Sequence, residues 1–275
     1  MSLVFTLSLS SPAVWKCSKS KLLVLGGTGD AVKFVHQFVS LCPQVEVITS
    51  LAGRTAQPQN LQGTVRIGGF GGVLGLVDYL RQEKIDFVVD LTHPCAGQIK
   101  HHAFLACRLA QVPYLLFCRP PWLPTPADRW ISVDRLEAVP AALPPTAQRV
   151  FITTGRQNLT PFLHLPHLWF LIRSVDPPTL EIPNSEVILD RGPFTLEREL
   201  ALLQEYRIDT IVTKNSGGDA TYAKILAARQ LHLPVVMVQR PPLPPAPVVS
   251  SLAAVLDQAV SFFHQDLQSS NPCLQ

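Results

Sequence analysis

A glycine-rich loop, Gly26–Asp30, follows the first predicted strand and precedes a predicted helix. Its sequence is Gly-Gly-Thr-Gly-Asp. Glycine lets the backbone approach a phosphate closely, and a helix that begins beside such a loop presents N–H groups and the positive end of its dipole. The spacing matches the first two glycines of G-x-G-x-x-G, but Val32 occupies the third position. We expect a nucleotide phosphate here, with an ordinary tight strand-to-helix turn as the alternative.

The segment after the second predicted strand indicates which dinucleotide binds. An NAD site usually carries Asp or Glu about 20 residues after the glycines, at the end of this strand. Here the chain continues with Ser50 and then Arg54, and no acidic residue intervenes. A hydroxyl and a guanidinium suit the 2′-phosphate of NADPH, because Arg makes bidentate, charge-assisted contacts with phosphate. The sequence therefore favours NADPH over NADH, and the alternative is a surface arginine in a loop.

Two more loops of the first half carry glycines or polar residues at predicted strand ends. The segment Gly68–Gly72 holds four glycines around Phe70, which indicates either close approach of a flat or charged ligand or a structural turn. The next strand is followed by Thr92 and His93. Ligands of open α/β sheets bind at the carboxyl ends of the strands, so His93 is a candidate donor to a phosphate or a carboxylate. The alternative is a histidine that only satisfies internal hydrogen bonds.

Three loops of the second half mirror these positions: Thr153–Arg156, Asp190–Phe194 and Lys214–Gly218. Arginines at strand ends would join them in lining a cationic cleft, a local bias that the net charge of +3 hides. A cleft lined with one sign of charge attracts an oppositely charged ligand, so we expect a polyanion. The alternative is that the arginines pair with neighbouring Asp or Glu. The arginines are Arg119, Arg173 and Arg240.

Apolar strands alternate with amphipathic helices along most of the chain, a pattern typical of a parallel sheet covered on both faces. The strands predicted in the first half are 21–25, 45–49, 87–91 and 114–117, and the helices are 30–39, 74–82 and 96–110. In the second half the predicted strands are 150–153, 169–175, 187–189, 210–212 and 235–238, and the helices are 195–206, 220–230 and 251–264.

The two halves resemble each other as duplicated units do. Leu80–Asp86 reads LRQEKID, Leu203–Asp209 reads LQEYRID 123 residues later, and Gly69 and Gly192 keep the same offset. A predicted strand that ends in Arg-Pro-Pro closes each half. We predict an α/β fold of two Rossmann-like parallel-sheet domains that face each other across a cleft. The predicted boundaries are an N-terminal extension at 1–20, an NADPH-binding domain at 21–122, a second α/β domain at 123–248, and a C-terminal helix and tail at 249–275.

Composition narrows the class of protein. Of the 275 residues, 47% are hydrophobic and 16% charged, and the apolar runs are far shorter than the ~18 residues of a membrane-spanning helix. We expect neither a membrane nor a nucleic-acid partner. The six cysteines form no Cys-x-x-Cys pair, which argues against structural zinc and a disulfide framework and favours the cytoplasm. A signal peptide would require a basic residue before its apolar region, and none precedes the apolar stretch at 3–9.

Six motifs carry a resemblance to a known family: Gly26–Ala31, Ser50–Thr55, Arg66–Gly72, Thr92–Pro94, Asp190–Phe194 and Lys214–Gly218. Taken together and in order, they resemble those of the precorrin-6A reductases, a family that includes the cobalt-precorrin-6A reductases. The similarity extends from Lys21 to Pro242. Its departures are small: Asp30 and Lys33 stand where the family commonly has Glu and a basic residue, and Cys95 stands where Phe is usual.

The resemblance implies an NADPH-linked reduction of a double bond in the corrin macrocycle on the route to vitamin B12, with hydride added at C19 and a proton at C18. The substrate is a small polycarboxylate tetrapyrrole, which suits a cationic cleft. NADPH is the expected cofactor, no metal ion is expected, and the protein would be a monomer or a homodimer. The cofactor side would include Gly26, Gly27, Thr28, Ser50, Arg54, Thr92 and His93, and the nicotinamide or the substrate would lie near Lys214, Asn215, Ser216 and Gly217.

Such a reductase needs little acid–base machinery, because the cofactor supplies the hydride and the protein positions and polarises. The candidate catalytic residues, which would supply the proton, are Asp176, Asp190 and Lys214, with His93 and water as alternatives. A short-chain dehydrogenase would need Tyr-x-x-x-Lys, and none of the four tyrosines is followed by Lys at that spacing. The remaining alternatives are a two-lobed protein that binds an anionic ligand and another NADP-dependent reductase.

Overall fold

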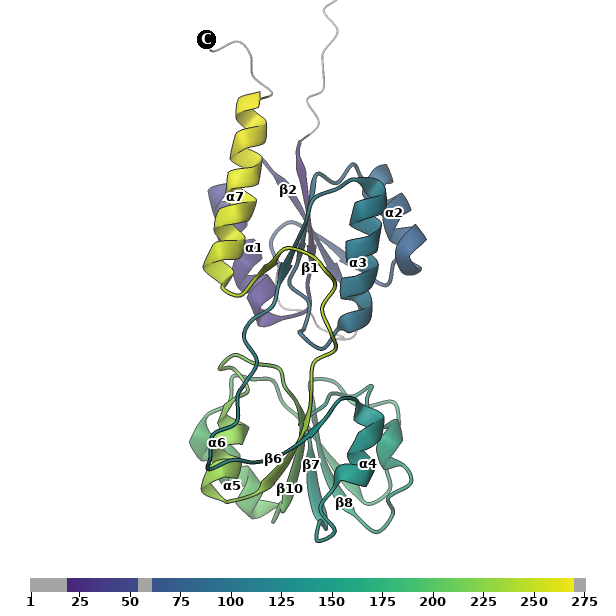
Figure 1. Ribbon diagram of the computed structural model, residues 1–275, viewed down its shortest axis with the longest axis vertical. Helices are drawn as coiled ribbons and strands as arrows, with labels where there is room; N and C mark the ends of the chain where they lie inside the picture. Colours follow the sequence, from purple (N-terminus) through teal and green to yellow (C-terminus); the bar gives the residue numbers. More distant parts are fainter. Residues whose placement is uncertain (1–18, 54–60, 270–275) are drawn as a thin grey trace, which may run out of the picture.

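The computed structural model describes residues 19–53 and 61–269, and it confirms the predicted α/β fold with two parallel sheets (Figure 1). Arg54 lies outside the described residues, as does most of the N-terminal extension. The sheets form two lobes, and two connecting segments run between them (Figure 1). Within the described ranges, no helix is long and apolar enough to cross a membrane.

The first sheet has the strand order β3-β2-β1-β4-β5-β12. Its strands are β1 (Lys21–Leu25), β2 (Glu46–Leu51), β3 (Thr64–Ile67), β4 (Phe87–Asp90), β5 (Tyr114–Phe117) and β12 (Val248–Val249), and its helices are α1 (Gly29–Leu41), α2 (Gly72–Gln82), α3 (Gly97–Ala110) and α7 (Leu252–Ser269). Successive side chains of a strand point to opposite faces. Leu22 and Val24 therefore pack with α1 and α7, whereas Leu23 and Leu25 pack with α2 and α3.

The second sheet has the corresponding order β9-β8-β7-β10-β11-β6. Its strands are β6 (Arg129–Val133), β7 (Arg149–Ile152), β8 (Trp169–Ser174), β9 (Ser185–Leu189), β10 (Thr210–Lys214) and β11 (Pro234–Val238). Its helical segments are η1 (Leu136–Ala138), α4 (Val139–Ala142), η2 (Thr160–Phe162), α5 (Leu196–Glu205) and α6 (Ala223–Gln230). Only the 3₁₀ turn η2 stands between β7 and β8, where the first lobe has α1 between β1 and β2. The duplicated lobes thus differ at the loop where the first carries its glycines.

The chain crosses between the lobes twice, and each crossing adds an edge strand to the sheet of the other lobe. After β5 the chain crosses to the second lobe, where β6 pairs in parallel with β11. After β11 it crosses back, and β12 pairs with β5. Both crossings begin with Arg-Pro-Pro, at Arg119 and Arg240. Proline has no N–H to donate and restricts φ, so these segments run as connectors outside the sheets.

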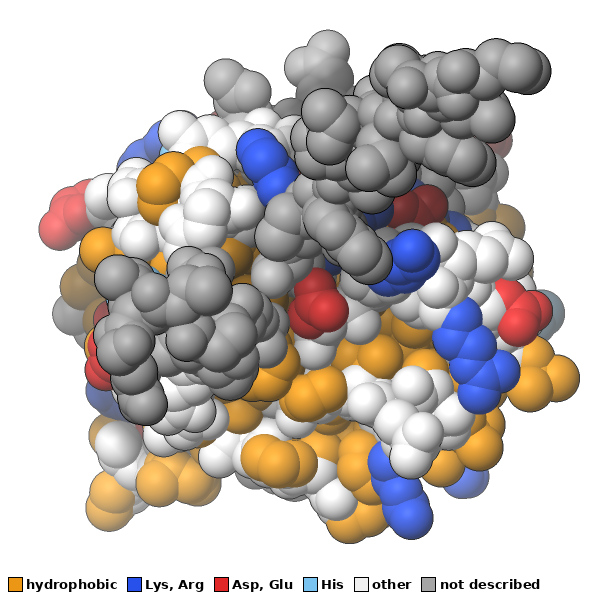
Figure 2. All heavy atoms as spheres, turned by 90° about the horizontal axis from the view of Figure 1, so that it is seen from above, with side chains coloured by type: hydrophobic (Ala, Val, Ile, Leu, Met, Phe, Trp, Pro, Cys, Tyr) orange, Lys and Arg blue, Asp and Glu red, His pale blue; other side chains and the backbone are white. Residues whose placement is uncertain are grey.

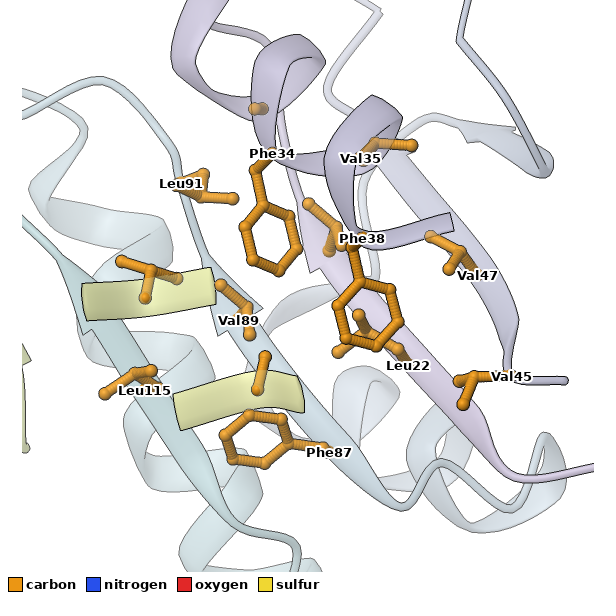
Figure 3. Close-up of a cluster of buried hydrophobic side chains, with 14 of the residues drawn as sticks. Leu22, Phe34, Val35, Phe38, Val45, Val47, Phe87, Val89, Leu91 and Leu115 are labelled. Carbon is orange, nitrogen blue, oxygen red and sulfur yellow. The ribbon is translucent and has the colours of Figure 1, made fainter. Parts of the chain in front are cut away.

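The face of the first sheet that carries α1 is sealed by aromatic packing (Figure 3). Phe34 and Phe38 point from α1 onto the strands, with their ring centroids 5.6 Å apart. Phe263 of α7 meets Phe38 edge-on at 5.8 Å. Each buried Phe contributes roughly 1.5–3 kcal/mol through removal of apolar surface from water. This packing fixes α1, and with it the glycine loop at its N-terminus, against the sheet.

Candidate functional site

The carboxyl ends of the two sheets lead into loops that meet at the waist of the molecule (Figure 1). In an open α/β sheet, ligands bind where the strand order reverses. That point lies between β1 and β4 in the first sheet and between β7 and β10 in the second. The loops after β4 and β10 are in contact, because His93 Nε2 lies 3.0 Å from Ser216 Oγ. Beside this contact a pocket is lined by residues of both lobes.

The loop formed by Gly26, Gly27 and Thr28 has the backbone geometry of a phosphate site. Gly27 has a φ of +103°, and a Cβ there would meet nothing within 4 Å, so the loop is open on that side. Thr28 Oγ1 accepts a hydrogen bond from the N–H of Ala31 at 3.2 Å and donates one to the carbonyl of Leu91 at 2.8 Å. Other N–H groups in the first turn of α1 lack acceptors within the helix. They remain as donors for an anion.

The carboxylate in this helix turn is neutralised by an arginine that follows the carboxyl end of β5. Asp30 pairs with the guanidinium of Arg119, which is 2.5 Å away, and Arg119 Nε donates to the carbonyl of Ser216 at 2.9 Å. A bare carboxylate here would repel a phosphate, and the arginine compensates its charge. The same guanidinium joins the glycine loop to the loop after β10.

The end of β2 lies against the glycine loop, where a Rossmann domain contacts the 2′-substituent of the adenosine ribose. The N–H of Gly26 donates to the carbonyl of Ser50 at 2.9 Å. Ser50 is buried, and its Oγ accepts a hydrogen bond from Arg66 Nη1 at 3.2 Å. An open phosphate loop, a helix N-terminus and a cation beside the ribose position fit NADPH.

A buried ion pair holds the segment that follows β4. Asp90 and Lys100 are both fully buried, with Nζ 3.4 Å from Oδ1. The carboxylate also accepts hydrogen bonds from the N–H and the hydroxyl of Thr92 and from the hydroxyl of Tyr114. Burial, together with this neighbouring carboxylate, raises the pKa of Tyr114. Thr92 is therefore oriented by internal contacts, and so is the start of the loop that carries His93.

His93 bridges the lobes as a neutral ring. The N–H of Cys95 donates to Nδ1 at 3.1 Å, which leaves the proton on Nε2 to be donated to Ser216 Oγ. Burial is the larger cause, and the positive charges of Arg119 and Lys214 act in the same direction, so that together they lower the pKa of His93 from 6.5 to about 3. The ring therefore remains uncharged at neutral pH, and the bridge is intact there.

Acid is expected to weaken the fold through this histidine. The pKa of His93 is near 6.5 in the unfolded chain and about 3 in the folded one, so its contribution is complete above pH 6.5 and is lost as the pH falls toward 3. Between pH 7 and pH 5 the loss amounts to about 2 kcal/mol of unfolding free energy. Urea titrations of the wild type and of His93→Gln at both pH values measure it. A variant whose stability falls by as much as that of the wild type would contradict the assignment.

The Lys214–Gly217 loop is fixed by internal contacts of Asn215 and Gly217. Asn215 is buried, and its amide accepts from the N–H of Trp122 at 2.8 Å and donates to the carbonyl of Trp122 at 3.1 Å. Gly217 has a φ of +65°, and a Cβ there would lie 2.1 Å from the carbonyl oxygen of Pro120. Asn215 and Gly217 thus shape the loop, whereas Lys214 and Ser216 line the pocket.

The three arginines expected to line a cationic cleft have internal partners. Arg119 pairs with Asp30, and Arg173 makes a buried bidentate pair with Glu199. Arg240 donates to the carbonyl oxygens of Arg119 and Pro120 on the first connector and to those of Asn215 and Ser216 in the loop after β10. The alternative of pairing with Asp or Glu therefore holds for Arg119 and Arg173. Arg173 still lines the pocket, stacked 3.7 Å from the ring centre of Phe194.

The pocket nevertheless gathers charged side chains. Arg156, Arg191, Lys214 and Lys224 line it, together with Asp176 and Asp190, the other two predicted proton donors. Asp190 accepts a hydrogen bond from the N–H of Arg191 at 2.8 Å. On the end of the first lobe, by contrast, Lys and Arg side chains lie apart from one another (Figure 2). The structure thus brings all three predicted catalytic residues to one pocket.

Lys224 is the least expected member of the pocket. Its side chain is 3% exposed, Nζ donates to the carbonyl of Thr221 at 2.7 Å, and the ammonium lies 5.1 Å from the ring centre of Trp122. Burial and, to a smaller extent, the positive charge of Arg173 lower its pKa from 10.5 to about 7. The sequence shows an ordinary helical lysine between Ala223 and Ile225, so no local signal marks it. Arg66 was named only as part of the motif Arg66–Gly72 and Lys100 was not singled out, because their partners Ser50 and Asp90 lie on other elements.

Comparison with known proteins gives a consistent result. A family model described as precorrin-6x reductase CbiJ/CobK matches residues 21–260. A precorrin-6A reductase of Rhodococcus erythropolis is 46% identical over 228 residues, which cover 82% of this chain and 92% of that protein. A precorrin-6A reductase of Rhodobacter capsulatus is 42% identical over 240 residues, covering 86% of this chain and 94% of the relative.

A solved structure agrees with this at the level of the fold. The chain described as CobK precorrin-6A reductase superposes with a TM-score of 0.82 at 40% sequence identity, covering 88% of this chain and 96% of that one. Sequence and fold thus match over nearly the full length of the relatives. This chain belongs to the precorrin-6x reductase CbiJ/CobK family.

Proposed function

We propose that the protein reduces precorrin-6A with NADPH in cobalamin biosynthesis. The relatives that are 42–46% identical carry the name precorrin-6A reductase. The observation that supports it most strongly is the joining of two unlike sites through His93 and Ser216. One is an open glycine loop at the switch point of the first sheet, and the other is a charged pocket at that of the second.

The first lobe binds the cofactor in this proposal. The N–H groups around Gly26, Gly27 and Thr28 bind the pyrophosphate, and Ser50 and Arg54 bind the 2′-phosphate, since Arg54 follows the end of β2 by three residues. Thr92, held by Asp90 and Lys100, closes the other side of the switch point. When bound, NADPH supplies a hydride to the substrate.

The second lobe holds the tetrapyrrole. Lys214 and Lys224 meet the carboxylates, and Asn215 and Gly217 fix the loop that carries Lys214. Asp176, Asp190 or Lys214 delivers the proton that accompanies the hydride, because all three line the same pocket. The described cysteines are free thiols, which supports a reducing compartment, the cytoplasm.

The test is an anaerobic assay of the purified protein. NADPH oxidation at 340 nm is followed with precorrin-6A, with its cobalt complex and with neither. We expect oxidation of one NADPH per molecule of the metal-free substrate. The variants Asp176→Asn, Asp190→Asn and Lys214→Met then identify the proton donor as the one whose kcat falls while the substrate Kd is retained. A protein that binds NADPH but oxidises it with neither tetrapyrrole would refute the proposal.

A further inference from the structure

Arg66 lies beside Ser50 at the carboxyl end of β2, where a Rossmann domain contacts the adenosine ribose. It lies in β3, the edge strand of the first sheet, in register with Ser50 of β2. Its Nη1 donates to Ser50 Oγ at 3.2 Å. Ser50 thereby accepts through its oxygen, and its own proton remains available for donation. A cation and a hydroxyl donor stand together at the carboxyl end of β2.

The guanidinium of Arg66 is held rigidly along one edge. Nη1 donates to the carbonyl of Gly68 at 2.7 Å, and Nη2 donates to that of Gly69 at 2.6 Å. Its flat face lies 3.8 Å from the ring centre of Phe70. The N–H groups left over are on Nε and Nη2, which form the other edge, spaced to bind two oxygens of one phosphate.

The charge of Arg66 lacks a counter-charge in the part of the chain that is described. No carboxylate there lies within ion-pair distance of it, whereas Arg119, Arg173 and Arg229 each pair with one. Arg66 is half-buried, so its unpaired charge is only partly solvated. A preorganised cation beside the ribose position, with no acid to satisfy it, is complementary to an additional anion on the ribose.

We propose that Arg66, together with Ser50, binds the 2′-phosphate of NADPH and sets the preference for NADPH over NADH. This inference rests on the proposed function and assigns a second arginine to the same phosphate as Arg54. The competing role is purely structural: Arg66 would only pin the glycine loop after β3. The two roles predict different effects of an Arg66 substitution on the affinity for ligands with and without a 2′-phosphate.

The experiment is calorimetric titration of the full chain with adenosine 2′,5′-bisphosphate and with 5′-AMP. The proteins are the wild type, Arg66→Met, Arg66→Lys, Ser50→Ala and, as a matched control, Arg81→Met, whose guanidinium donates to the carbonyl of Leu109 on α3. We expect Arg66→Met to weaken the bisphosphate roughly 30- to 100-fold and 5′-AMP less than threefold. Arg66→Lys should recover part of the loss, Ser50→Ala should lose roughly three- to tenfold on the bisphosphate alone, and Arg81→Met should match the wild type.

The outcomes separate the inference from the function on which it rests. Equal weakening of both ligands by Arg66→Met, or no weakening of either, would overturn the role of Arg66 while the wild-type preference still stood. A wild type that binds both ligands equally would overturn the NADPH preference itself. Circular dichroism of each variant at the titration temperature confirms that the titrated protein is folded.

Discussion

Replacing Lys100 by Met is expected to destabilise the protein by about 3–5 kcal/mol, because it leaves the charge of Asp90 buried without its partner. Asp90 is 0% exposed, and the hydrogen bonds from Thr92 and Tyr114 compensate its charge only in part. Urea unfolding at pH 7 measures the loss.

The double variant Asp90→Asn/Lys100→Met serves as the control for this prediction. Removing both charges eliminates the uncompensated carboxylate, so the double variant should be more stable than Lys100→Met alone. A loss below about 1 kcal/mol for the single variant, or a double variant less stable than the single one, would show that the pair is not what holds the segment after β4.

Replacing Lys224 by Met is expected to have the opposite effect on stability. A pKa of about 7 in the folded protein, against 10.5 unfolded, means that burying the charged lysine costs roughly 4 kcal/mol at pH 7. Met fills a similar volume without that cost but loses the bond to Thr221. We expect a net gain of about 1–4 kcal/mol. The unfolded chain binds more protons between pH 7 and 10.5, so the wild type alone should gain stability as the pH rises through that range.

The same substitution should impair substrate binding. A pocket lysine that meets a carboxylate contributes a charge-assisted hydrogen bond, and its loss should raise the KM for precorrin-6A roughly ten- to hundredfold while the Kd for NADPH is unchanged. Lys33→Met, at an exposed position of α1, is the matched control and should change neither stability nor KM. An unchanged KM for Lys224→Met would remove Lys224 from the substrate site. A lower stability would instead mean that its charge is well compensated in the folded protein.

The strands that could be predicted are those with a recognisable apolar pattern in their own sequence. Continuous apolar runs such as Lys21–Leu25 and Tyr114–Phe117 are strands with the bounds expected, because strands of a doubly covered parallel sheet are buried on both faces. The repeat of Arg-Pro-Pro correctly marked equivalent ends of the two halves. Strand β6 was missed, since its mixed exposure at an edge of the sheet gives no apolar run. The sheet that each of β6 and β12 joins depends on tertiary contacts, so the local sequence of neither strand predicts it.

The strand ends that carry the candidate site were predictable from the sequence, but the pairing of their charged side chains was not. The loops after β1, β4 and β10 could be assigned because they follow recognisable strands. The sequence could not show which arginines have an acidic partner and which do not. Arg119 pairs with Asp30, which lies 89 positions away, and Arg173 pairs with Glu199 on another element. Arg66 reaches Ser50 only through the pairing of β2 with β3. Such partnerships depend on sheet register, which sequence spacing alone does not give.

We expect a hydride to pass between the two lobes, from a nicotinamide beside the joined loops after β4 and β10 to a tetrapyrrole in the charged pocket. Mass spectrometry of the product formed with NADPH deuterated at C4 tests this most directly. One of the two C4 deuterium diastereomers is expected to yield a product one mass unit heavier than unlabelled NADPH does, and the other a product of unchanged mass. A reduced product that carries deuterium from neither diastereomer would contradict direct transfer and the arrangement of the site that follows from it.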